Sequence, residues 1–300
     1  MKVGIVGLHG KGNGHPFSFS AIINGYSERE FKKTRYKNIL NYLKKKKSKE
    51  FGIKNVSVTH AWTQNYNLTK TLCKASKIKN PVKKYTDMIG SIDALIIARD
   101  DLHLKISLPF LKKNIPVFVD KPLSFKKDEL NKFKYYMSRA KLMSTSGLRY
   151  SKEIEILKKK IKKIGNIKFI IANVVNDMSK YGVHMLDIID ELGFLNVVKI
   201  QKINSKYLSY NFICKKNLNI IVNCFGKVEP MYNLTIIGSK GLETINFLDN
   251  FVAFKNTLNN FFKMIRTKKA ILNPNRTIKI MKLIKIVNSI KKQKLIKANV

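Results

Sequence analysis

The sequence predicts an α/β domain built on a doubly wound parallel sheet, followed by an α+β domain with a largely antiparallel open sheet and helices. Short apolar strands alternate with helical segments through the first half of the chain, which is typical of parallel βαβ units. From about residue 151, strand-like segments instead follow one another in series. A length of 300 residues also favours two domains.

Composition narrows the class of protein. Apolar residues make up 44% of the chain, and no apolar run reaches the roughly 18–20 residues of a membrane helix. Glycines occupy the place of a signal peptide's apolar region, so we expect a cytoplasmic protein with no membrane partner. Cys73, Cys214 and Cys224 are widely spaced, which indicates neither disulfides nor a zinc site, and we expect no metal.

The formal net charge is +40, from 59 Lys and Arg against 19 Asp and Glu. Such a charge is typical of partners of nucleic acids or anionic membranes. The lysines are spread along the whole chain, however, without zinc-finger spacing or an RNA-binding aromatic motif. We therefore attribute the charge to background composition and expect no nucleic-acid partner. The positive field should still attract phosphate-bearing substrates.

The first domain opens with a strand and a helix, and Pro16 stands at the first helical position, where its missing N–H costs nothing. A lysine-rich helical insertion over 28–48 follows. The strands are expected at Val3–Val6, Asn55–Trp62, Ala94–Ala98, Val117–Val119 and Leu142–Ser146, and the helices at Pro16–Gly25, Asn67–Ser76, Leu104–Lys113 and Asp128–Ala140. We place the first domain at 1–122 and the second at 123–300, with 123–150 completing the first.

The second domain opens with a helix at Lys152–Ile164, whose apolar residues have helical spacing. Two helices close the chain. The strands between them are expected at Ile167–Val175, Val197–Ile203, Tyr207–Cys214, Leu218–Cys224, Asn233–Gly238 and Leu242–Phe247, and the closing helices at Asn256–Arg266 and Arg276–Lys292.

Glycines crowd the turn after the first strand, in the stretch VGIVGLHGKGNGHP (3–16). A strand, a glycine-rich turn and a helix start form the context in which a Rossmann domain binds a dinucleotide. Gly7 permits the tight turn, and the amides around Gly10–Gly14 can bind the pyrophosphate. Written as G-x-G-x-x-G, the run reads Gly7, His9 and Gly12, so the middle glycine is missing. Either the His9 side chain points away from the phosphate or the phosphate binds at a slightly different place. Gly10 could then provide the close approach of backbone to phosphate that the missing glycine normally allows.

No carboxylate ends the second strand, where an acid usually binds the adenosine ribose. The strand ends in HAWTQN, and Thr63 or Gln64 could bind a ribose hydroxyl or a 2′-phosphate. The cofactor is therefore expected to be NAD or NADP, with the missing acid favouring tolerance of NADP.

A second motif, VFVDKPL (117–123), places Asp120-Lys121-Pro122 after the fifth strand. With it the chain resembles the glucose–fructose oxidoreductase/inositol dehydrogenase (Gfo/Idh/MocA) family, whose members carry an acidic-Lys-Pro motif there. The resemblance extends to Gly12-x-x-His15, to His103, and to Gly182-x-His184-x-x-Asp187 at a helix start. The stretches IIGSKGLETI (236–245) and FFKMIRTKKAIL also match, so the similarity runs along essentially the whole chain.

The resemblance implies an NAD(P)-dependent oxidoreductase that transfers a hydride between a nicotinamide cofactor and a hydroxyl or carbonyl carbon of a sugar derivative. It implies a homodimer or homotetramer formed through the open sheet. Together with the glycine-rich turn and the end of the second strand, it predicts catalytic residues Lys121, His184 and Asp187, with Lys180 at the position of a usual family aspartate. The predicted cofactor-binding residues are Gly7, His9, Gly10, Gly12, His15, Thr63, Ala98, His103, Asp120 and Lys121, and the predicted substrate-binding residues are Arg149, Tyr150 and Tyr181.

The chemistry of hydride transfer agrees with these roles, because it needs a base for the hydroxyl proton and a cation near the developing oxyanion. Pro122 restricts Lys121 to an extended backbone at the sheet's carboxyl edge, so Lys121 would hydrogen-bond the reacting hydroxyl. His184 would be the acid/base group, and Asp187, one helical turn later, could orient it. Each of these residues also has a purely structural interpretation. Lys121 could be a surface lysine, and His184 a histidine packed in its helix. Tyr181 could be a packed aromatic residue, and Arg149 could form an interdomain salt bridge.

Lys180 departs from the family pattern, since members that oxidise sugars often carry an aspartate two residues before the glycine. Two ammonium groups near one substrate would lower each other's pKa unless a bound anion held them apart. We therefore expect a substrate with a carboxylate or phosphate, such as an acidic or nucleotide-linked sugar. His9, the missing acid and Lys180 leave two alternatives open, a non-catalytic NAD(P)-binding protein and a redox-neutral NAD-dependent glycoside hydrolase.

Overall fold

The structure, a computed structural model, describes residues 1–8, 14–203, 205–290 and 295–298. The chain divides into two compact units, Met1–Ser144 with Phe254–Pro274, and Thr145–Ala253 with Asn275–Val300. The sequence analysis did not anticipate that 254–274 return to the first unit. Aromatic packing explains the return, because Phe254 lies against Phe19 with ring centroids 5.2 Å apart. Phe261 packs on Phe118 of the central sheet in the same way, at 5.8 Å.

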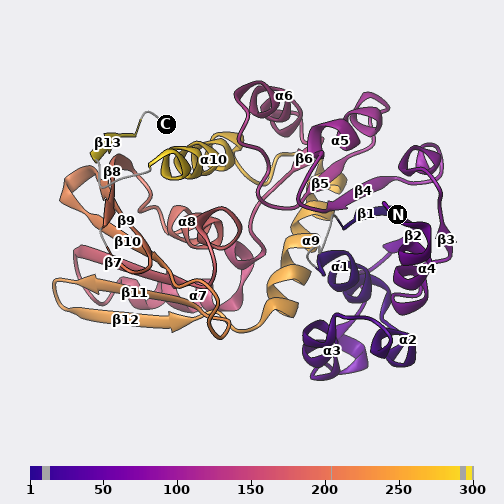
Figure 1. Ribbon diagram of the computed structural model, residues 1–300, viewed down its shortest axis with the longest axis horizontal. Coiled ribbons are helices and arrows are strands. Elements are labelled where there is room, and N and C mark those ends of the chain that lie inside the picture. Colours follow the sequence, from indigo (N-terminus) through magenta and orange to yellow (C-terminus); the bar gives the residue numbers. More distant parts are fainter. Residues whose placement is uncertain (9–13, 204, 291–294, 299–300) are drawn as a thin grey trace. The chain divides into compact units, whose positions relative to one another are not determined.

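The first unit contains the predicted doubly wound parallel sheet, which is thereby confirmed (Figure 1). Its strand order is β3-β2-β1-β4-β5-β6, the order of dinucleotide-binding folds, and every described pair is parallel. The strands are β1 (Lys2–Gly7), β2 (Ser57–Thr63), β3 (Asn80–Pro81), β4 (Ala94–Ala98), β5 (Val117–Val119) and β6 (Leu142–Met143). All lie within a few residues of their predicted places except β3, which was not predicted.

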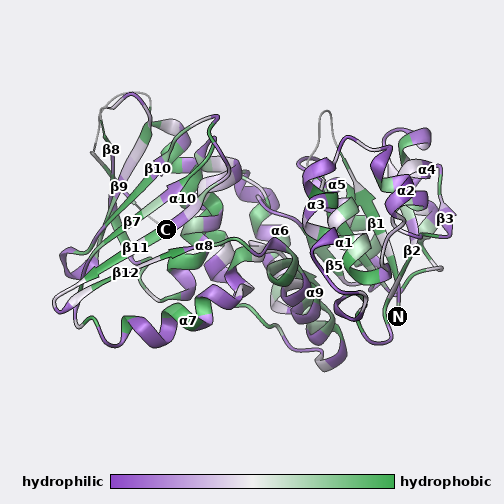
Figure 2. Cartoon of the chain, turned by 90° about the horizontal axis from the view of Figure 1, so that it is seen from below, coloured by the Kyte–Doolittle hydropathy of each residue, from purple (hydrophilic) through white to green (hydrophobic). Residues whose placement is uncertain are grey.

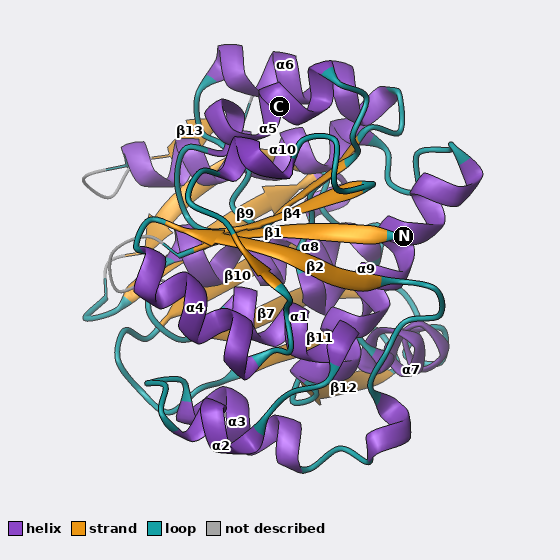
Figure 3. Ribbon diagram, turned by 90° about the vertical axis from the view of Figure 1, so that its right-hand side faces the viewer, coloured by secondary structure: helices purple, strands orange, loops and turns teal. Residues whose placement is uncertain are grey.

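Helices cover both faces of this sheet, which is why its central strands are continuously apolar. Figure 3 shows α1 and α4 on one side of the sheet and α5 and α6 on the other. All five residues of β4 are buried. The helices are α1 (His15–Asn24), α2 (Glu28–Lys32), α3 (Lys37–Lys44), α4 (Tyr66–Ala75), α5 (His103–Lys112) and α6 (Lys127–Ser138).

The lysine-rich insertion consists of α2 and α3, which expose their lysines and bury a few apolar side chains. Phe31 and Leu43 are fully buried. Phe31 and Tyr36 both contact Phe17 of α1, at ring-centroid distances of 5.6 and 4.7 Å. The insertion is therefore docked on the first unit through aromatic packing.

The second unit is built on a mixed sheet of order β12-β11-β7-β10-β9-β8-β13. The β7–β10 pair is parallel and the other described pairs are antiparallel, as predicted. The strand β13 was not predicted. The elements are α7 (Lys152–Ile161), β7 (Ile167–Val174), α8 (Val183–Glu191), β8 (Val197–Ile203), β9 (Leu208–Cys214), β10 (Asn219–Cys224), β11 (Tyr232–Gly238), β12 (Gly241–Asn246), α10 (Pro274–Ser289) and β13 (Leu295–Lys297). Between β12 and α10 runs α9 (Asn250–Thr267), which belongs to the first unit from Phe254 on.

This second sheet buries one face. Ile220, Val222 and Cys224 of β10 are buried, and the residues between them are half-buried. The same alternation appears along β7, and Figure 2 shows hydrophobic residues along these strands. The half-buried face carries asparagines that hydrogen-bond across neighbouring strands, in the order Asn246, Asn233, Asn173 and Asn223. Within the described residues, no helix combines the length and apolarity needed to cross a membrane.

Candidate functional site

Gly7 ends β1, and α1 begins at His15, so the glycine-rich turn lies at the carboxyl edge of the parallel sheet. A Cβ atom on Gly7 would lie 2.3 Å from Cγ of Pro16, so only glycine lets the helix start pack this closely on the strand. The N-terminus of α1 carries the positive end of a helix dipole and can bind a phosphate. The predicted residues His9, Gly10 and Gly12 lie outside the described residues.

The structure brings together two predicted cofactor residues that are far apart in the sequence, His15 and Asp120. Nδ1 of His15 lies 2.5 Å from Oδ2 of Asp120, which is 3% exposed. Burial opposes ionisation of Asp120, but His15 and Lys121 outweigh it and hold its pKa below the usual value. The pair ties the start of α1 to the end of β5. Lys121 follows directly, is half-buried, and precedes Pro122 through a cis peptide bond.

His103 braces backbone segments. Its Nδ1 lies 2.8 Å from the carbonyl oxygen of Leu123, and its Nε2 lies 2.6 Å from that of Arg99. The ring is 5% exposed and connects the turn after β4 to the segment after β5. Ala98, the last residue of β4, is fully buried. A direct role of either residue in cofactor binding stays a prediction.

Thr63, the predicted ribose contact, is 2% exposed at the end of β2. Its hydroxyl donates to the carbonyl oxygen of Asn65 at 2.7 Å and lies 3.0 Å from Oγ1 of Thr69. These bonds hold the turn into α4. The adjacent Gln64 is exposed, so its side chain is easier for a ligand to reach than that of Thr63.

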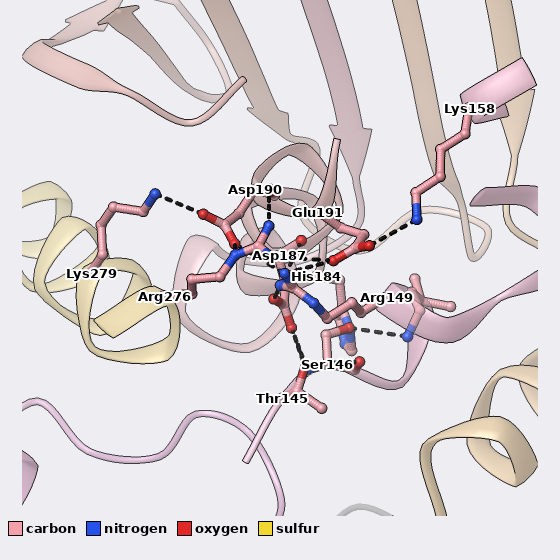
Figure 4. Close-up of polar contacts among 11 residues, drawn as sticks. Thr145, Ser146, Arg149, Lys158, His184, Asp187, Asp190, Glu191, Arg276 and Lys279 are labelled. Atoms are coloured by element: carbon pink, nitrogen blue, oxygen red, sulfur yellow. Dashed lines mark hydrogen bonds and ion pairs between the residues drawn. The ribbon is translucent and has the colours of Figure 1, made fainter. Parts of the chain in front are cut away.

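A histidine and a serine meet in the second unit (Figure 4). Nδ1 of His184, in the first turn of α8, lies 2.6 Å from Oγ of Ser146, and both residues are buried. Sequence reasoning expected Asp187 to orient His184. Its carboxylate instead accepts hydrogen bonds from the hydroxyl of Thr145 and the backbone N–H of Ser146, each at 2.6 Å. Asp187 therefore fixes Ser146, and Ser146 fixes the imidazole. With Nδ1 engaged, proton exchange with a ligand falls to Nε2.

Arg149 is the centre of a buried ion cluster on α8 and α10 (Figure 4). Its guanidinium is 1% exposed and pairs with Asp187, with Asp190 at 3.1 Å and with Glu191 at 2.8 Å. All three carboxylates belong to the same unit, so the interdomain salt bridge considered for Arg149 is wrong. The guanidinium is committed to this cluster, and contact of Arg149 with substrate stays a prediction.

Three further cations complete this cluster: Arg276 at Asp190, Lys279 at Asp190 and Lys158 at Glu191, at 2.5, 2.7 and 2.8 Å. Burial raises the pKa of both carboxyls, but these cations and Arg149 lower the pKa values of Asp190 and Glu191 below their usual range. Asp190 and Glu191 are therefore ionised at neutral pH.

Aromatic side chains surround His184. The ring of Tyr232 meets the imidazole edge-on at 5.3 Å and stacks on Tyr181 at 6.2 Å. Burial, with Tyr181 adding to it, raises the pKa of the Tyr232 phenol. Tyr232 and Ser146 were missed because no local motif marks them: their proximity to His184 arises only from the fold. Burial raises the pKa of Tyr150 to about 12.

Lys180 is exposed in the short turn Met178–Gly182 that precedes α8. Its backbone N–H donates to Oδ1 of Asp177 at 2.9 Å, which holds the turn. Lys180 and His184 therefore flank Gly182 on one continuous segment.

No protein-family model and no curated protein sequence matches the chain. Solved structures match it over its whole length. Myo-inositol 2-dehydrogenase from Lactobacillus plantarum has a TM-score of 0.79 at 15% identity, covering 100% of this chain and 99% of that one. Scyllo-inositol dehydrogenase from Lactobacillus casei, with bound NAD(H) and scyllo-inositol, has a TM-score of 0.76 at 15% identity, covering 100% and 99%. The chain therefore has the two-domain fold of these dehydrogenases.

Proposed function

We propose that the chain is an NAD(P)-dependent oxidoreductase that interconverts a secondary alcohol and a ketone on a sugar derivative or cyclitol. The observation that carries the proposal is the fold shared over the whole chain with dehydrogenases crystallised with NAD(H) and an inositol. Fold alone does not fix chemistry. The motif residues Asp120-Lys121 after β5 and His184 at the start of α8 support the same reaction.

The residues of the first unit fit a dinucleotide. The close approach at Gly7, the N-terminus of α1 and the sheet order β3-β2-β1-β4 are the parts that bind a pyrophosphate in this fold. When bound, the nicotinamide supplies or accepts the hydride. The His15–Asp120 pair would keep the helix start and the end of β5 in place around it.

Lys121 and His184 would carry the polar chemistry. The Lys121 ammonium would donate a hydrogen bond to the reacting oxygen and stabilise the negative charge that develops there. Nε2 of His184 would take the hydroxyl proton during oxidation and return it during reduction. Ser146 and Asp187 would act on this step only through His184.

The substrate would carry a negative charge. Lys180 stands where sugar-oxidising members of the resembling family often have an aspartate, and its side chain is exposed in the turn before α8. A carboxylate or phosphate on the substrate would pair with this ammonium. The formal charge of +40 would further raise the rate of encounter with such an anion.

A coenzyme assay at 340 nm tests the proposal. Purified protein is mixed with NAD⁺ or NADP⁺ and a panel of inositols, aldoses and their acidic counterparts. Growth of absorbance with at least one of them is the expected result. A bound coenzyme with no net absorbance change but release of a sugar would instead identify a glycoside hydrolase. Coenzyme binding with no turnover of either kind would identify a non-catalytic binding protein.

We also propose that the half-buried face of the second sheet pairs with another copy of the chain. Ile171 and Ile221 lie on this face beside the row of asparagine amides, and an open sheet with apolar residues is a common interface. Light scattering coupled to gel filtration should therefore give twice or four times the 34.6 kDa of one chain.

A further inference from the structure

A buried guanidinium with an unused donor lies at the carboxyl end of β4. Arg99 follows the last residue of that strand and is 3% exposed. Its Nε lies 2.5 Å from Oδ1 of Asp101, but Nη1 is buried and has no hydrogen-bond partner among the described residues. Burying a cationic donor without a partner is unfavourable, and such a group is commonly completed by a ligand.

The guanidinium is held toward β2. Its Cζ lies 5.6 Å from the ring centroid of Trp62, the residue before the end of that strand. Trp62 is itself fixed, because its Nε1 donates to the carbonyl oxygen of Lys83 at 3.1 Å and its ring meets Tyr85 at 5.4 Å. Since β1 lies between β2 and β4, Arg99 reaches across the carboxyl end of β1. In this sheet order, the adenosine ribose of a dinucleotide lies at the end of β2.

The charges around this position are of both signs, because Asp100 and Asp101 follow Arg99 directly. The residues that end β2 and follow it, Thr63, Gln64 and Asn65, are neutral, so the end of β2 itself offers no carboxylate to the ribose. The segment that accepts the Trp62 hydrogen bond carries two exposed lysines, Lys83 and Lys84. Asp101 occupies the Nε edge of Arg99 and leaves Nη1 for another acceptor.

We propose that Arg99 binds the 2′-phosphate of the adenosine ribose, so that the chain selects NADP(H) over NAD(H). The inference rests on the proposed dinucleotide site. Trp62 holds the guanidinium plane by a cation–π contact, and Nη1 donates to a phosphate oxygen. An arginine near the ribose is the usual way in which this fold accommodates the extra phosphate.

Isothermal titration of the full chain with NADP⁺ and NAD⁺ tests the inference without turnover. The wild type should bind NADP⁺ about tenfold or more tightly than NAD⁺, since a charge-assisted hydrogen bond to phosphate is gained. Arg99→Gln should weaken NADP⁺ by a similar factor and leave NAD⁺ unchanged, which also shows that the variant is folded. Arg139→Gln is the matched control, because Arg139 stacks on Tyr135 at an exposed position of the same unit.

Each other outcome of these titrations would overturn a specific part of the inference. Equal or tighter binding of NAD⁺ by the wild type would overturn the inference while keeping the proposed function, and this comparison stands even if Arg99→Gln does not fold. An NADP⁺ preference that survives Arg99→Gln would overturn the assignment of the phosphate to Arg99. Failure of both coenzymes to bind would overturn the proposed function itself.

Discussion

Oγ of Ser146 lies 2.6 Å from Nδ1 of His184, and the two side chains are 38 residues apart in the sequence. The hydroxyl also accepts the backbone N–H of Leu148 at 3.2 Å, so its position is set by its own turn. A buried imidazole with one nitrogen engaged keeps a single orientation and a single nitrogen for proton transfer. Ser146 is therefore a positioning residue for the proposed base.

Ser146→Ala should lower kcat about fivefold, because the lost hydrogen bond is worth about 1 kcal/mol in holding the imidazole. Coenzyme affinity should not change, since the serine lies in the other unit from the glycine-rich turn. Steady-state kinetics with titration of the coenzyme would measure both.

Ser151→Ala is the control, because Ser151 is equally buried and its Oγ has no hydrogen-bond partner among the described residues. It should keep full activity. Equal losses in the two variants would mean that Ser146 contributes only to packing.

Lys121→Met should reduce kcat/KM at least about a hundredfold, the usual loss when one charge-stabilising donor is removed from a reacting oxygen. The coenzyme should still bind, because Asp120 and His15 keep their contact. Lys126→Met, at an exposed lysine paired with Glu129, provides the comparison and should behave as the wild type. Full turnover by Lys121→Met would remove Lys121 from the mechanism.

Most strands and helices could be predicted because their signals are local. Buried parallel strands such as Ala94–Ala98 are short runs of apolar residues. Helix boundaries are marked by residues such as Pro16 near the start of α1 and Gly25 just after its end. The two-residue β3 and the closing β13 give no such signal, since each is a strand only by pairing with a neighbour. The return of 254–274 to the first unit likewise depends on aromatic packing between distant segments.

Site residues could be predicted from the sequence where they stand in a motif, and they were missed where only the fold brings them to the site. Lys121, His184 and Asp187 stand in recognisable spacings. Arg99 and Ser146 stand in none, and their roles depend on partners 37 and 38 residues away. Burial also changed the interpretation of Arg149, because the three carboxylates that engage it stand close together in the sequence but 38 or more residues from Arg149, and only the fold brings them to it.

Arg149→Met should lower the free energy of unfolding by about 3–5 kcal/mol. It removes the cation shared by three buried carboxylates and leaves them partly unpaired. Urea unfolding followed by circular dichroism would measure it. Lys160→Met breaks an exposed pair with Glu243 and should cost less than about 1 kcal/mol. A loss at Arg149 as small as that at Lys160 would contradict the cluster's structural role.

The ion cluster should also make the fold sensitive to acid. The folded pKa values of Asp190 and Glu191 lie below their unfolded values, so their contribution is present above about pH 4.5 and is lost as pH falls through the folded values. Asp190→Asn should therefore destabilise the protein at pH 7, and its difference from the wild type should shrink toward pH 3.

Unfolding curves at several pH values would show this convergence. Glu155→Gln removes a largely exposed carboxylate and should track the wild type throughout. A destabilisation by Asp190→Asn that stayed constant from pH 7 to pH 3 would mean that ionisation of this carboxyl does not matter.

Lys180→Asp should reverse the preference of the proposed oxidoreductase between charged and neutral substrates. If the exposed ammonium pairs with an anionic group, the carboxylate in its place repels that group and restores the polarity that sugar-oxidising members of the resembling family have. The ratio of kcat/KM for an acidic sugar to that for its neutral counterpart should fall about tenfold or more.

The high positive charge could produce a similar preference by steering alone, and a second charge reversal separates the two causes. Lys159→Asp changes the net charge by the same amount at an exposed position of α7 in the same unit. Steering would lower the rate with the acidic sugar equally in both variants and would fade with added salt. If Lys180 instead forms a direct ion pair with the substrate, only Lys180→Asp should change the KM for the acidic sugar, and the change should persist at moderate salt. Equal turnover of acidic and neutral sugars by the wild type would show that Lys180 does not select the substrate.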